Sequence, residues 1–142
     1  MPSETLPEVP VPGLKPRVRI AFIDRLLFFL GAIAGLCGVA GAAAAAHVTG
    51  SGSLDIAANF LLFHGPLLVA VALADHVGFG RAGPLRLGGI LIAIGLIGFS
   101  GDLTVRALQG VSPLPMAAPT GGTLLMLGWL FLAIAALVPR RA

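Results

Sequence analysis

Residues 26–46 read LLFFLGAIAGLCGVAGAAAAA, a run of 21 residues that contains no charged side chain. A helix of roughly 20 apolar residues crosses the hydrocarbon core of a bilayer, which is about 30 Å thick. Because no water is present there to bond free backbone groups, such a run must satisfy its own hydrogen bonds as a helix. The run therefore predicts a transmembrane helix.

Three further apolar runs follow along the chain. They cover residues 56–74, 85–105 and 121–138, and the middle one includes Arg86 and Asp102 near its ends. That run is the shortest when these two residues are left out, but a bundle of three spans would put basic segments on conflicting sides of the membrane. The polar alternation of spanning β-strands is absent. The sequence thus predicts an all-α integral membrane bundle of four transmembrane helices.

The composition of the 142-residue chain supports this class. Apolar residues make up 57% of the chain and charged residues 11%, against roughly 45–50% and about 25% in an average soluble protein. A soluble enzyme is disfavoured, and we expect no enzymatic activity. The net charge of +3 does not indicate nucleic-acid binding, because the basic residues flank apolar runs, where they act as topological markers. The expected surroundings are the lipid bilayer.

The basic residues also predict the topology. Eight of the nine lie before the first run, between the second run and the start of the third, or after the fourth, and only Arg106 lies on the other side. Both termini are therefore expected in the cytoplasm. The Pro-rich residues 1–20 are expected to form a flexible cytoplasmic tail, and residues 21–142 the membrane domain. The alanines that end the first run resemble a signal-peptide cleavage site, but the run exceeds the roughly 7–15 apolar residues of a signal peptide, which favours an uncleaved anchor.

Glycines recur within the predicted spans at helical spacing. Small residues let the backbones of membrane helices approach closely. This pattern is compatible with packing inside one bundle, or with an interface to another subunit or a second copy. The glycines assigned to helix packing are Gly31, Gly35, Gly95, Gly98, Gly121 and Gly122. Cys37, the only cysteine, is interpreted as a small buried hydrophobe.

Few polar side chains enter the spans, and each is costly in hydrocarbon. All except His64 lie toward the outer ends of the spans, and Asp102 and Arg106 have the spacing of an ion pair within one helix. Two interpretations are compatible with these residues. They form a structural network that fixes the register of the helices, or they form an outward-opening site for a small solute or a proton. His47 and His64 lie at different depths, which disfavours a shared haem, and no cofactor or metal is expected. The candidate residues are His47, Asn59, His64, Ser100, Asp102 and Arg106.

Four blocks of the sequence have a familiar pattern. They are GAAAAAH at 41–47, FLLFHGPLL at 60–68, GFSGDL at 98–103 and APTGGTLLMLGWL at 118–130. Through these blocks, residues 26–138 resemble the small four-helix bacterial membrane family of unknown function 423, which contains the YgdD-like proteins. Two positions depart from the family pattern: Ala46 stands where glycine usually precedes the first histidine, and Asp102 stands where serine is common.

The resemblance implies a protein of the bacterial inner membrane with four helices, and it carries over no activity. It implies that His47, His64, Ser100 and the pair Gly121 and Gly122 are the positions to test. Together with the short loops, the small-residue faces and the lack of a catalytic motif, it favours an accessory or scaffold subunit that packs against other membrane helices, in a larger complex or by self-association. The alternative is a small oligomeric transporter or channel, because four short helices form a poor pore alone.

Overall fold

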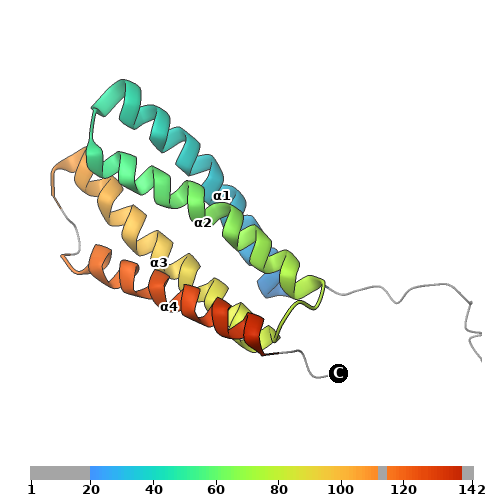
Figure 1. The fold of residues 1–142 in the computed structure, drawn as a ribbon. Helices are drawn as coiled ribbons and strands as arrows, with labels where there is room; N and C mark the ends of the chain where they lie inside the picture. Colours follow the sequence, from blue (N-terminus) through green and yellow to red (C-terminus); the bar gives the residue numbers. More distant parts are fainter. Residues whose placement is uncertain (1–19, 112–114, 139–142) are drawn as a thin grey trace, which may run out of the picture.

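The computed structural model describes residues 20–111 and 115–138 of the chain. These residues form four long helices and one short helical turn (Figure 1). All four helices are long and apolar enough to cross a membrane, so the chain is a multi-pass, all-α membrane protein. The proposed tail over residues 1–20 lies almost wholly outside the described residues. The helices are α1 (Phe22–Ala44), α2 (Gly52–His76), α3 (Ala82–Gln109) and α4 (Ala117–Leu137).

The helices extend beyond the apolar runs that predict them. The uncharged part of the third run is the shortest of the four, yet α3 is the longest of the four helices at 28 residues. Its flanking charged side chains remain helical and pair with neighbours, and α3 ends only at Gly110, which has a φ of 72°. After α1, a π-helical turn, η1 (Ala45–Thr49), leads to Gly50 with a φ of 59°. Glycine is the preferred residue at such left-handed helix ends.

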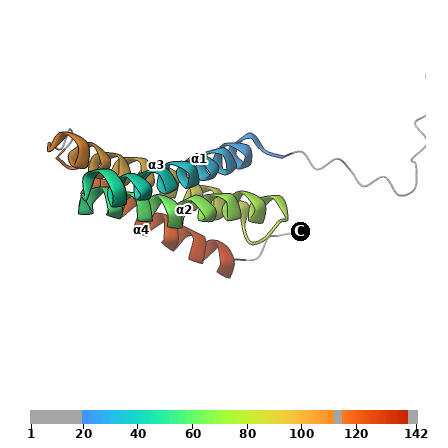
Figure 2. The same cartoon turned by 90° about the horizontal axis from the view of Figure 1, so that it is seen from above.

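The bundle consists of two helical hairpins, α1 with α2 and α3 with α4 (Figures 1 and 2). Glycines set the close approach inside each hairpin. A Cβ placed on Gly31 would lie 2.6 Å from the carbonyl oxygen of Gly65, and one placed on Gly95 would lie 2.7 Å from that of Gly121. Contacts between α2 and α3 join the two hairpins, and these contacts are less extensive than those within each hairpin.

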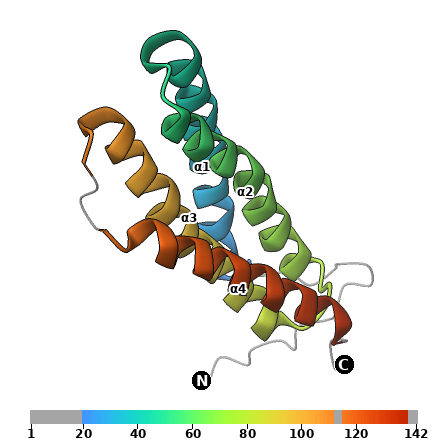
Figure 3. The ribbon, with the colours of Figure 1, turned by 60° about the vertical axis from the view of Figure 1, so that its left-hand side comes forward.

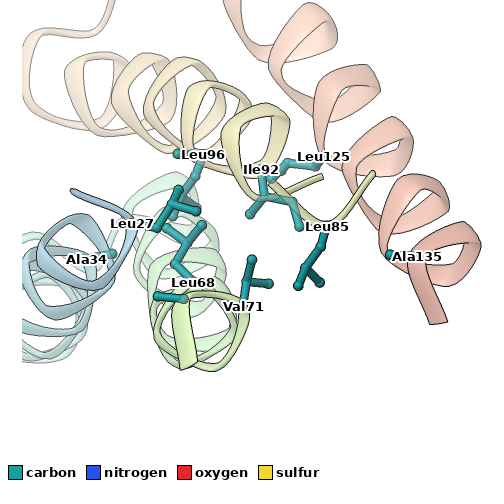
Figure 4. Close-up of a cluster of buried hydrophobic side chains, with 11 residues drawn as sticks. Leu27, Ala34, Leu68, Val71, Leu85, Ile92, Leu96, Leu125 and Ala135 are labelled. Carbon is teal, nitrogen blue, oxygen red and sulfur yellow. The ribbon is translucent and has the colours of Figure 1, made fainter. Parts of the chain in front are cut away.

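The two ends of the bundle differ in their packing. We call the end where α1 begins and α4 ends the terminal end, and the opposite end the distal end. The buried apolar core lies mainly in the half of the bundle toward the terminal end, through residues such as Leu27, Leu68 and Ile92 of α1, α2 and α3, and α4 adds Leu125 and Ala135 (Figure 4). Toward the distal end the two hairpins diverge (Figure 3). The large apolar side chains left exposed on all four helices are those expected to face lipid.

Candidate functional site

An ion cluster at the terminal end joins three helices. Arg86 of α3 lies with its Nε 2.5 Å from Oδ2 of Asp75 on α2 and 3.8 Å from Oδ1 of Asp24 on α1. Both aspartates are buried, whereas the arginine side chain is 39% exposed. The cluster places one guanidinium between two carboxylates and so holds α1, α2 and α3 together where the hairpins meet.

The fourth helix is also attached at this end. The backbone N–H of Arg81, just before α3, donates to the carbonyl of Ala135 near the end of α4, with a separation of 3.3 Å. Sequence reasoning assigned Arg81 and Arg86 only a topological role and did not single out Asp24 or Asp75. No local spacing could have revealed the cluster, because its three charged members come from three different helices.

The polar residues toward the distal end do not meet at one site. Asn59 donates from Nδ2 to Oδ2 of Asp55, 3.3 Å away, on the exposed side of α2. The pair predicted within α3 is present, with Nη2 of Arg106 at 3.0 Å from Oδ2 of the buried Asp102. His47 lies exposed in η1. These groups therefore form separate local contacts rather than one network.

His64 connects α2 with α4 through a residue that sequence reasoning treated only as a packing position. The indole Nε1–H of Trp129 donates to Nε2 of His64 over 3.3 Å. With that nitrogen acting as acceptor, we assign the imidazole proton to Nδ1, which lies 2.9 Å from the carbonyl oxygen of Phe60. Both ring nitrogens of this buried histidine are thereby satisfied, and the indole is held in a defined orientation.

The His64–Trp129 contact lies on a large groove between α2, α3 and α4, which we call the α2–α4 groove. Its volume is about 880 Å³, and its wall is mainly apolar. Phe60 and Phe99 pack against each other within it, with ring centroids 4.3 Å apart. Arg106 contributes the charged group of the wall. Of the six candidate polar residues, this groove brings together His64 and Arg106.

Ser100 lines a different groove, which we call the α1–α3 groove. Residues of α1, α2 and α3 form its wall. This cavity has a volume of about 420 Å³ and an almost wholly apolar wall. The side chain of Ser100 is buried, and its Oγ has no hydrogen-bond partner among the described residues. Cys37 lines the same groove from α1 and is exposed, so the expectation that it is buried is wrong.

The packing glycines fall into two groups. Gly31, Gly95 and Gly121 sit at close contacts inside a hairpin, where a Cβ would lie within 3.0 Å of neighbouring backbone. A Cβ placed on Gly98 or Gly122 would lie at an ordinary van der Waals distance from its neighbours, and one placed on Gly35 would meet no atom within 4 Å. Among residues 20–111 and 115–138, no three His, Cys, Asp or Glu side chains come together as metal ligands.

Comparison with known proteins identifies the sequence class of the chain. A family model described as a protein of unknown function (DUF423) matches residues 30–122. This region includes most of α1, all of α2 and α3, and the start of α4. No solved structure matches the chain.

Proposed function

The chain belongs to the DUF423 family, whose function is unknown, and we propose that it is a non-enzymatic accessory subunit of the bacterial inner membrane that receives a helix of a larger membrane protein. The α2–α4 groove is the surface to which we assign this role. Most of its wall comes from α2, α3 and α4, three helices long and apolar enough to span a membrane, which favours a membrane component as the ligand.

The observation that carries this proposal is the hydrogen-bonded, half-exposed indole of Trp129 on the wall of the α2–α4 groove. Trp129 is 52% exposed, and the neighbouring Met126 is 68% exposed. Aromatic residues and methionine are enriched where proteins dock, because they provide large contact areas. The hydrogen bond to His64 orients the indole before binding, and a preorganised side chain loses less conformational entropy on docking. Lipid tails require no such orientation.

A photocrosslinking amino acid placed at Met126 in native membranes tests the proposal. We expect a crosslink to one discrete membrane protein other than this chain. The matched control is the same amino acid at Leu36, which is exposed to a similar degree on α1 and lies outside the α2–α4 groove. Crosslinks from Met126 only to lipid, or only to a second copy of the chain, would overturn the proposal, and the second result would favour a homo-oligomer.

We also propose that both termini lie in the cytoplasm. Within the described residues, Arg25, Arg81 and Arg86 lie at or near the terminal end, whereas Arg106 lies near the distal end. This asymmetry supports a cytoplasmic terminal end by the positive-inside rule. A reporter that is active only in the cytoplasm is expected to work at either end of the full chain, and an inactive reporter at both ends would reverse the topology.

A further inference from the structure

A third hollow lies at the terminal end, between α1 and α2, and we call it the α1–α2 pocket. Its volume is about 420 Å³, and it shares no residue with either groove. α1 contributes Asp24, Arg25 and Phe28 to its wall, and α2 contributes Leu73 and His76. The pocket therefore lies outside the surface that we assign to a partner helix.

The polar side chains that are open to this pocket are basic. Arg25 and His76 are both exposed, and neither takes part in a side-chain hydrogen bond or an ion pair with another described residue. Asp24 also lines the wall, but its side chain is only 5% exposed, and its Oδ1 lies 3.8 Å from Nε of Arg86. A ligand in the pocket therefore meets a guanidinium and an imidazole, both of which can donate hydrogen bonds, whereas the buried carboxylate belongs to the ion cluster.

The basic and the apolar residues of the pocket lie at different depths. With 1.5 Å per residue, Arg25 and His76 lie about 16 and 18 Å from the middles of their spans. Phe28 and Leu73, which are about half exposed, lie about 11 and 14 Å from the same points. The hydrocarbon core ends about 15 Å from the midplane of a bilayer. When the spans are centred, the basic pair is thus at the level of the lipid head groups and the apolar pair is within the hydrocarbon.

This order of groups matches a phospholipid of the leaflet at the terminal end. Its phosphate lies at the level of Arg25 and His76, and its acyl chains lie beside Phe28 and Leu73. A zwitterionic head group adds an ammonium group that these basic residues do not attract, whereas an anionic head group keeps its net negative charge. Basic pockets between membrane helices are suited to such head groups. We infer that the α1–α2 pocket binds an anionic phospholipid, whose phosphate is held by Arg25 and His76.

The sequence before the pocket supports an anionic ligand. Lys15, Arg17 and Arg19 come within ten residues of Arg25, and Asp24 is the only acidic residue between positions 15 and 25. A cluster of four or more basic residues next to a membrane span attracts anionic lipids electrostatically. Such a cluster concentrates anionic lipid at this end of the bundle, and the pocket provides the site at which one molecule is held.

A tryptophan placed in the pocket tests the inference. Trp129 is the only tryptophan of the chain, so the full chain with Trp129→Phe and Phe28→Trp reports on the pocket alone. In mixed vesicles of phosphatidylglycerol and phosphatidylcholine, in which one lipid or the other has dibrominated acyl chains, quenching of the fluorescence gives the relative binding constant of the two lipids. We expect phosphatidylglycerol to bind about fivefold more tightly, the ratio that corresponds to one basic residue at a membrane surface.

A matched control separates a site from general attraction to the surface. Leu87→Trp, in the same Trp129→Phe background, places the reporter on α3 at a similar exposure, near the same end of the bundle and outside the pocket. Its ratio of binding constants is expected to be close to one. An equal preference at Leu87→Trp and Phe28→Trp would show surface attraction without a site and would overturn the inference.

Substitutions of Arg25 identify the cause of the selectivity. Arg25→Gln is expected to lower the ratio at Phe28→Trp to that of the control, whereas Arg25→Lys keeps the charge and most of the preference. Circular dichroism checks that both variants keep their helices. No preference for phosphatidylglycerol at Phe28→Trp, or an unchanged preference in Arg25→Gln, would overturn the inference. Either result leaves the proposed accessory role unaffected, because that role is tested by crosslinking from Met126 on another face.

Discussion

The terminal and distal ends of the bundle are held together by different means. At the terminal end, Arg86 bridges Asp24 and Asp75, and the apolar core fills the space between the hairpins. Toward the distal end, the ion pair Asp102–Arg106 lies within one helix, and the hairpins diverge (Figure 3). Interactions between helices hold the terminal end, whereas interactions within a helix or a hairpin dominate the distal end.

This difference explains where the grooves lie. Lipid tails are as apolar as the helix surfaces, so burial of apolar area does not bring membrane helices together. Helices that lack polar bridges or close backbone packing can diverge and expose their inner faces. Both grooves include residues from the distal half of α3, such as Arg106 and Ser100. Because the polar bridge between helices lies at the terminal end, the faces exposed in the distal half are available to ligands or partners.

Among the variants that test this difference between the two ends, Arg86→Ala is expected to change the stability of the bundle most. The variant leaves two buried aspartates without their bridging cation, and it should lower the free energy of unfolding by about 3 kcal/mol, the low end for a broken buried pair, because the arginine is partly exposed. Unfolding in mixed micelles, followed by circular dichroism, measures the change. Arg25→Ala, at an exposed position of the same end, is the matched control and should change stability by less than about 0.5 kcal/mol. Equal stability of Arg86→Ala and Arg25→Ala would show that the cluster does not fasten the bundle.

The second prediction concerns the glycines that hold the hairpins together. A Cβ on Gly121 would lie 2.5 Å from the backbone nitrogen of Phe99, whereas one on Gly35 would meet no atom within 4 Å. Gly121→Ala should therefore force α3 and α4 apart and lower the unfolding free energy by about 2 kcal/mol, as overpacking of a close contact does. Gly35→Ala should be neutral or slightly stabilising, because alanine is the better helix former. The same unfolding assay compares the two variants, and an equal loss in both would mean that the approach of α3 to α4 is not limited by Gly121.

The four helices could be predicted from the sequence because a transmembrane span is a local property of the chain. Its length and its lack of charge decide it without reference to the other spans. The Asp102–Arg106 pair was predictable for the same reason, since four residues separate its members on one helix. The glycines were recognisable as packing residues, but which of them meet a neighbouring backbone depends on how the helices face each other.

Contacts between distant residues could not be predicted in this way. His64 and Trp129 are 65 positions apart, and neither the spacing nor the composition indicates that their side chains meet. The burial of Cys37 was predicted wrongly because an apolar side chain in a span is equally stable in the protein core and in the bilayer, since both are apolar environments. For the same reason, the sequence could not show which spans line a groove.

The bond between His64 and Trp129 gives the smallest expected effect, and it tests whether the middle of the bundle has a polar link between the hairpins. Trp129→Phe removes the donor while it keeps an aromatic ring, and His64→Leu removes the acceptor. Hydrogen bonds between membrane helices contribute about 0.6 kcal/mol on average, so a double-mutant cycle should give a coupling energy of about that size, measured as the non-additivity of the unfolding free energies. A coupling energy indistinguishable from zero would mean that α2 and α4 are not linked there, and Trp129 would no longer be a preorganised anchor. If the coupling is present, Trp129→Phe should also weaken crosslinking from Met126, because the same bond that joins the hairpins orients the indole in the groove.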